Sequence, residues 1–417
     1  MSSHKEFLAD AMSHYESLPN ETNEIYKKYQ VDLPLRFAEA ELPADSERHS
    51  AEADSVCSEI ESATKIKFDA IISSHYAKSN SPEVRIYGPG DVDQEALMSK
   101  MFKSSEDKLA AFANASSKHF IFIERAGANK QGLNMLFVNT CNLSSQVFFN
   151  VAPGSKLELL ELHVSSKDCK GIASTLREVV VPKESEIEIN SIHNENDATD
   201  VVSLCKCRTE EKSKFRANFV YVGGRNTKTK NIADSAGQQS SVDISELAYG
   251  SGDQKFDLTT FITNSKPYSI ARLESGAALE GKSHCMLKGF AKVDNGAKGC
   301  LSKITERGIL LSRDARVDAL PDMSIDYSNE VKATHSAATA PIDREALFYL
   351  ESRGLDEKQA RSMYIIAFLG KYVAGMAGGV PHEVAMSIML NKLGKSPYTA
   401  MPSMTTKGAW MSSRRNA

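Results

Sequence analysis

The sequence predicts a mainly β body between two helical flanks. Between His119 and Pro321, short runs rich in β-branched and aromatic residues follow one another, and helical signals nearly vanish. The polar segments between these runs are mostly too short for crossover helices, which disfavours an α/β fold. Before and after this region, apolar residues recur at helical spacing instead. A sandwich, a propeller and a β-helix all fit such strands, and no fixed repeat period chooses between them.

The first hundred or so residues are predicted to be helical and acidic. Helical spacing runs through residues 6–15, 22–29 and 93–114. Residues 39–61 carry eight acidic side chains against one basic side chain, Arg48. Such a run is more typical of a solvated face or a mobile connector than of an acidic docking patch. We interpret this region as a packing or docking module.

The strands of the β body are predicted from their local composition, and they end near a single histidine, His335. Met323 and Ile325 alternate with polar residues just before it, as a half-buried strand requires. The eleven predicted strand runs span residues 119–125, 133–139, 146–151, 156–164, 175–181, 185–192, 201–207, 215–222, 257–262, 269–274 and 284–293.

Capped helices are predicted after His335. Pro341-Ile342-Asp343 is typical of a helix start, and Gly354 of its stop. Asp356 and Gln359 form a predicted capping box for a second helix, and Pro381 opens a third. The predicted domains are therefore an N-terminal helical domain (1–117), a β core (118–333) and a C-terminal helical domain (334–417) whose tail, from residue 395, we expect to be mobile.

Composition excludes several classes of protein. A net charge of −4 provides no electrostatic footprint for nucleic acid or an anionic membrane. No apolar run approaches the ~20 residues of a membrane span, and the N-terminus has no signal-peptide core. Seven scattered cysteines, an odd number, argue against a disulfide framework. We expect a cytoplasmic protein with no nucleic-acid or membrane partner.

The stretch from Leu320 to Tyr372 closely resembles the C-terminal signature of the SufB/SufD family of iron–sulfur cluster assembly scaffolds. It contains His335-Ser336-Ala337-Ala338-Thr339, followed by Phe348-Tyr349-Leu350 and Ser352-Arg353-Gly354. Together with residues 269–293, the resemblance covers roughly residues 105–372. It implies a right-handed parallel β-helix flanked by N-terminal and C-terminal helical domains. It also implies a non-enzymatic scaffold that works with a SufC-type ABC ATPase.

The resemblance favours the SufD branch of this family. SufB-type members have a cysteine at a fixed distance before the histidine, and counting back by that distance from His335 reaches Arg307 here. Cys300 lies seven residues earlier, so a strand would have to slip in register to replace it. Ser336 is small, as in SufD-type members, whereas SufB types tend to have glutamate. A SufB-type scaffold that binds the nascent cluster directly remains the alternative within the family.

The resemblance also implies the site residues and partners. His335 is the expected cluster-assembly residue, and it can be only part of a metal site because clusters are held mainly by thiolates. A cluster is therefore expected transiently at a subunit interface, with ligands from a partner chain, and none is held stably by this chain alone. The expected partner is a SufB-type sister or a second copy of this chain. Two questions stay open: whether a flavin is bound, and whether the histidine only caps the strand stack. The residues expected to dock the ATPase are Phe348, Tyr349, Ser352, Arg353 and Gly354.

Other possible sites are weaker. Cys205 and Cys207 share one strand face but are too close in sequence for usual metal-ligand spacing, so we predict buried structural thiols. Cys285 and His284 point to opposite faces of a strand.

Residues 276–283, GAALEGKS, match the phosphate-loop pattern, but a strand follows them where a helix is needed. A nucleotide hydrolase using this loop is the alternative from a different class of function. A polysaccharide-acting β-helix is disfavoured because the sequence contains one tryptophan, Trp410, in the tail.

Overall fold

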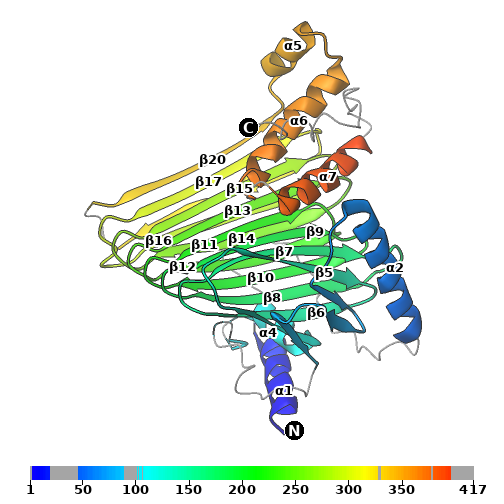
Figure 1. The fold of residues 1–417 in the computed structure, drawn as a ribbon. Helices are drawn as coiled ribbons and strands as arrows, with labels where there is room; N and C mark the ends of the chain where they lie inside the picture. The colour runs from blue at the N-terminus through cyan, green and yellow to red at the C-terminus, as the bar shows by residue number, and fades with distance from the viewer. Residues whose placement is uncertain are drawn as a thin grey trace.

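The computed structural model shows a two-sheet parallel β-helix with helices on its outer faces (Figure 1). The structure describes residues 2–18, 46–88, 101, 103–105, 107–326, 330–376 and 379–395. Each turn of the coil contributes one strand to each of two ten-stranded sheets, with about eight turns between residues 119 and 341. The parallel β-helix implied by the resemblance is confirmed.

Neighbouring strands run parallel, except for the antiparallel pairs β1–β2 and β3–β4. The first sheet contains, in spatial order, β2 (Ala77–Ser79), β1 (Ala70–Ser73), β5 (Gln131–Asn139), β7 (Lys156–Ser165), β9 (Glu186–Asn194), β11 (Lys214–Tyr221), β13 (Ser241–Gly250), β15 (Ile270–Leu279), β17 (Leu301–Leu310) and β20 (Lys332–Pro341). The second contains β3 (Val84–Tyr87), β4 (His119–Arg125), β6 (Leu143–Val151), β8 (Ile172–Val181), β10 (Asp200–Thr209), β12 (Asn226–Ser235), β14 (Lys255–Asn264), β16 (His284–Val293) and β18 (Arg316–Ala319), with β19 (Asp322–Ile325) also paired to β16.

The length of a turn varies along the coil. Gln131 pairs with Leu157 in an early turn, and Leu301 pairs with Lys332 in the last turn, which is the longer of the two. Because this spacing changes, the repeat has no fixed period in the sequence. The register is nevertheless continuous, so equivalent side chains stack in columns from strand to strand.

One corner of the coil is a column of left-handed residues, each followed by a buried serine. Glu184, Lys212, Gln239 and Tyr268 have φ between 55° and 58°. The N–H of Glu184 donates to the carbonyl of Glu211 in the next turn at 3.0 Å, and the other corners repeat this bond. The serines that follow, all fully buried, are Ser185, Ser213, Ser240 and Ser269. The same corner in the last turn is Gly299-Cys300, so Cys300 occupies a structural position of the coil.

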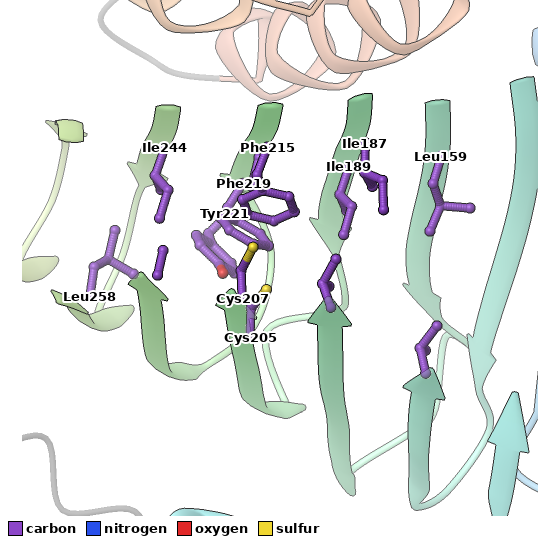
Figure 2. Close-up of a cluster of buried hydrophobic side chains, with 14 of the residues drawn as sticks. Leu159, Ile187, Ile189, Cys205, Cys207, Phe215, Phe219, Tyr221, Ile244 and Leu258 are labelled. Atoms are coloured by element: carbon purple, nitrogen blue, oxygen red, sulfur yellow. The ribbon is translucent and has the colours of Figure 1, made fainter. Parts of the chain in front are cut away.

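The interior between the sheets is filled by side chains at alternate strand positions, as expected for strands with one face in a core. Figure 2 shows Ile187 and Ile189 of β9 and Phe215 and Phe219 of β11 pointing into this interior. All four are at most 1% exposed.

Helices cover the outer faces of both sheets. α2 (Ser46–Thr64), α6 (Glu357–Val373) and α7 (Val380–Gly394) pack on apolar side chains of the first sheet, including Leu160, Ile192 and Leu247. α4 (Lys108–Ser116) packs on Leu176 and Leu204 of the second sheet, and α1 (Ser2–Ser17) packs on α4. α5 (Arg344–Ser352) contributes no buried residue. In the described part of the chain, no helix is both long and apolar enough to cross a membrane.

The prediction that the first hundred residues are helical is partly wrong. Residues 70–87 form β1, β2 and β3, because β1 and β3 find backbone partners on β5 and β4 at the start of the coil. Residues 6–15 lie in α1, as predicted. Of the predicted helical stretch 93–114, residues 108–114 lie in α4, whereas the described residues between 101 and 107 are not helical. The predicted segment 22–29 and the tail from residue 396 lie outside the described residues.

The predicted C-terminal helices are confirmed. Asp343 caps α5 by accepting the Glu345 N–H, and Asp356 and Gln359 form the predicted capping box of α6. A proline opens α7.

Candidate functional site

β20 is the last strand of the first sheet, and in the described structure it has a neighbour on one side only. It pairs with β17 along its whole length, and most of its residues are exposed. The Lys332 N–H donates to the Cys300 carbonyl at 3.0 Å. Because successive strand residues direct their backbone groups to opposite sides, the odd-numbered residues from 333 to 339 direct theirs away from β17. This edge can therefore accept another strand.

His335 lies in the middle of β20, so the prediction that the strand ends before this histidine is wrong. The prediction relied on alternating apolar side chains, which this alanine- and threonine-rich strand lacks, whereas backbone pairing with β17 continues to Pro341. The His335 side chain is exposed, and its register partner is Ile304. Its same-face neighbours on β20 are Ala333 and Ala337, which provide no ligand atoms.

Neither Arg307 nor Cys300 reaches His335. Arg307 pairs with Ala338, so the two side chains lie on the same face of the sheet. Ala338 is three residues from His335 on the same strand, so the His335 side chain lies on the opposite face. Cys300 precedes Ile304 by four residues, about 13 Å along the strand. It is 1% exposed and packs against Val293 and Ala297. The slip in register that would bring Cys300 level with His335 does not occur.

The residues predicted to dock an ATPase lie together on α5 and its C-terminal turn. Phe348 is 72% exposed and Tyr349 57% exposed. The Ser352 hydroxyl donates to the Tyr349 carbonyl at 2.7 Å, and the Arg353 guanidinium lies 5.0 Å from the centre of the Tyr349 ring. Gly354 ends the helix with φ of 96°, a conformation that disfavours other residues. Figure 1 shows α5 at one end of the molecule, beyond α6.

The phosphate-loop lookalike is a packing feature of the coil. Gly276 lies inside β15, where a Cβ atom would approach the Tyr372 ring of α6 to 2.3 Å. Ser283 is fully buried, and its hydroxyl donates to the Glu280 carbonyl at 2.7 Å. β16 follows directly, so no helix N-terminus directs its amides to a phosphate.

The paired cysteines are structural, as predicted. Cys205 and Cys207 both point into the interior (Figure 2). Burial raises the pKa of Cys205 to about 12 and that of Cys207 well above its ordinary value, so both thiols stay protonated. Cys285 is fully buried, whereas the neighbouring His284 contacts Asp318 at 2.7 Å on the outer face.

Sequence reasoning missed a buried polar network inside the coil. The fully buried Arg177 of β8 donates to Glu161 of β7 at 2.7 Å, and to Ser191 and Ser203 at 3.0 Å each. Burial alone would raise the pKa of Glu161, but the Arg177 guanidinium holds it well below its usual range. Removing either partner would leave an uncompensated buried charge, so this ion pair ties the two sheets together. The available signal was a charged residue at an inward position of an apolar strand.

Next to this network, ligand atoms of His163, His193 and Glu195 lie within 4.8 Å of one another. The two imidazole rings stack at 4.2 Å with an interplanar angle of 10°, so their nitrogen lone pairs run parallel and do not converge on one ion. Arg177 also donates to His163 Nε2 at 3.2 Å. Burial, reinforced by His193, lowers the pKa of His163 to about 3. The trio is therefore a packed polar ladder rather than a formed metal site.

The fold and these surfaces define a class of protein: a parallel β-helix with a free strand edge and a short helix that carries exposed aromatic side chains. Residues 138–368, more than half of the chain, match the SufBD core domain of the SUF system for iron–sulfur cluster assembly. The chain therefore belongs to the SufBD family of iron–sulfur cluster assembly proteins.

Three relatives illustrate the breadth of this similarity. The chain is 24% identical over 238 residues to the iron–sulfur cluster assembly protein SufD of Escherichia coli. The aligned region covers 57% of this chain and 56% of the relative. It is 22% identical over 290 residues to SufD of Bacillus subtilis, covering 68% and 66%. It is 25% identical over 226 residues to the chloroplastic protein ABCI7 of Arabidopsis thaliana, covering 54% and 47%. The matched region thus spans about half to two thirds of each relative.

Proposed function

We propose that this chain is a SufD-like scaffold component of the Suf machinery, which pairs through β20 with a SufB-type subunit or with a second copy of itself. The observation that carries the proposal is the exposed edge of β20 with His335 at its centre. An unpaired strand edge is a template for another strand unless charges, prolines or bulges protect it. β20 has no proline before Pro341, and the residues that follow His335, Ser336 to Ala338, are small. A second copy paired in this way would form an isologous two-fold contact.

An iron–sulfur cluster is the cargo of this function. Imidazole is an occasional cluster ligand, and thiolates provide the rest. His335 has Ile304 beside it and no cysteine within reach on β17 or β20, so the remaining ligands come from the partner chain. The cluster is held transiently at the interface, and this chain alone holds none stably. This arrangement favours the SufD-like role over a SufB-type scaffold that binds the nascent cluster directly.

The exposed face of α5 is the contact for a SufC-type ABC ATPase. Exposed aromatic side chains such as Phe348 and Tyr349 are typical anchors of a protein interface. α5 connects through α6 to β15, so movement of the ATPase reaches the strands next to β20. Nucleotide turnover belongs to the partner, and this chain has no turnover of its own, since residues 276–283 form the end of a strand and a corner of the coil. The complex works in the cytoplasm.

Anaerobic co-purification with the candidate SufB-type and SufC-type partners tests the proposal, with iron and sulfide measured on the complex. His335→Ala should keep both partners and lose most of the iron and sulfide. Phe348→Ser combined with Tyr349→Ser should lose the ATPase and keep the sister subunit. Thr334→Ala, next to His335 on the other strand face, is the matched control and should behave as wild type. A His335→Ala complex that assembles as much iron and sulfide as wild type would show that His335 is structural.

A further inference from the structure

Cys141 differs from the other six cysteines of the chain. All seven lie in the described residues, and six are buried, with exposed fractions of 6% or less. Burial raises the pKa of each of these six thiols. Cys141 is partly exposed, in the corner between β5 and β6. Its Sγ lies 3.4 Å from Nε2 of His75, which is itself partly exposed between β1 and β2.

The corner around this thiol is well defined. The Ser74 hydroxyl accepts the N–H groups of Thr140 at 3.0 Å and Cys141 at 3.3 Å. The Cys169 thiol donates to the Cys141 carbonyl at 3.4 Å. A Cβ atom on Gly171 would come within 1.4 Å of that carbonyl oxygen, so only glycine fits beside it. The backbone of Cys141 is therefore held in place next to the imidazole.

The same corner contains spare hydrogen-bond donors. In the part of the chain that the structure describes, Asn139 Nδ2 and Thr140 Oγ1 are buried without a hydrogen-bond partner. Asn139 is 1% exposed, and its Oδ1 accepts from Ser74 at 3.2 Å. A buried amide with unused N–H groups is uncommon in proteins and indicates an oxygen-bearing group or water that it serves.

We propose that Cys141 is the oxidant-sensitive thiol of this protein, with His75 as its base and small hydroperoxides as its electrophile. The imidazole takes the thiol proton, and the thiolate attacks one peroxide oxygen. The S–O bond forms as the O–O bond breaks, and the leaving hydroxide of hydrogen peroxide, or the alkoxide of an organic hydroperoxide, takes the proton from the imidazolium to give water or an alcohol. Sulfur loses two electrons to become a sulfenic acid, and the peroxide gains them.

The test uses the full-length chain and maps each cysteine by mass spectrometry. After brief treatment with hydrogen peroxide in the presence of dimedone, Cys141 should be modified first, as the dimedone adduct or as a disulfide with Cys169. N-ethylmaleimide should react with Cys141 faster than with any other cysteine at pH 7. His75→Asn should slow that reaction at pH 7, because the variant has no imidazole to take the thiol proton. Cys300→Ser is the matched control and should leave the Cys141 rate unchanged.

Two results would overturn the proposal. One is that Cys141 reacts with N-ethylmaleimide no faster than the buried Cys300 in the wild-type chain. This comparison needs no variant, so it contradicts the proposal even if His75→Asn fails to fold. The other is a folded His75→Asn variant, verified by circular dichroism, whose Cys141 reacts at the wild-type rate at pH 7. The proposal is independent of the Suf assignment, so neither result bears on the role of His335.

Discussion

Glu306 is a buried carboxyl group on β17, the strand that pairs with the last strand of the coil. It is fully buried, and its Oε1 accepts the Gly289 N–H at 2.7 Å. Its Oε2 has no hydrogen-bond partner among the described residues. Burial, reinforced by Glu246 two strands away, raises the pKa of Glu306 to about 8. The carboxyl group is therefore mostly protonated at neutral pH.

This pKa predicts how stability changes with pH. Between the ordinary value of 4.5 and about 8, folded Glu306 keeps a proton that the unfolded chain releases. Its contribution to stability is complete below pH 4.5 and is lost as the pH rises through 8. Glu306→Gln removes this titration, so the variant should be more stable than wild type at pH 8.5 and differ less at pH 5, as measured by urea unfolding. Glu351→Gln, at an exposed position on α5, is the control and should keep the wild-type dependence of stability on pH. A Glu306→Gln variant that also keeps the wild-type dependence would contradict the prediction.

The residues of the site were predictable to different degrees. Phe348 to Gly354 form a continuous sequence string, so resemblance located them. His335 was located in the same way, but its neighbours Ile304 and Ala338 depend on strand pairing. The contacts of Arg177 with Glu161 and of Cys141 with His75 join residues 16 and 66 positions apart. No local pattern reports such contacts.

At the scale of elements, the position of α6 on β15 depends on one glycine. Gly276 leaves room for the Tyr372 ring, and a Cβ atom there would lie 2.3 Å from it. Gly276→Ala should therefore destabilise the protein by about 1–3 kcal/mol, as overpacking of a core does. The exposed Lys282, which the phosphate-loop pattern would make essential, should tolerate alanine within about 0.5 kcal/mol. Thermal unfolding of both variants checks this, and ATP turnover by the chain alone that Lys282→Ala abolishes would contradict it.

The strands that were missed have a common cause. The predicted runs omit residues 226–250 and 301–310, which form β12, β13 and β17. β12 has the sequence NTKTKNIADS, in which polar side chains occupy both faces, so it lacks the apolar alternation of an isolated strand. It is a strand because β10 and β14 provide backbone partners on both sides. The left-handed residue and serine at each corner were a usable signal, but their spacing is not constant.

At the scale of the whole molecule, the coil is closed by helices and β1–β3 at its start and open along β20 at its end. The Ala337 N–H faces the free edge, whereas the Ala338 N–H faces β17. Ala337→Pro should therefore keep the wild-type melting temperature but lose pairing with the sister subunit or a second copy. Ala338→Pro, the matched control, should lower the melting temperature because it removes a bond within the sheet. Sedimentation equilibrium measures the pairing, and an Ala337→Pro chain that pairs as tightly as wild type would place the interface elsewhere.

The sequence by itself determined the β body, the capped C-terminal helices, the buried thiols at Cys205 and Cys207 and the family string on α5. These features follow from neighbours within one strand or one helical turn, where side-chain periodicity and capping act. Only the tertiary structure decided that the strands coil in parallel, that β20 continues past His335 to Pro341, and that residues 70–87 are strands. The physical reason is that backbone pairing joins strands that lie a full turn of the coil apart in the sequence, and a local pattern of burial does not specify which strand lies alongside.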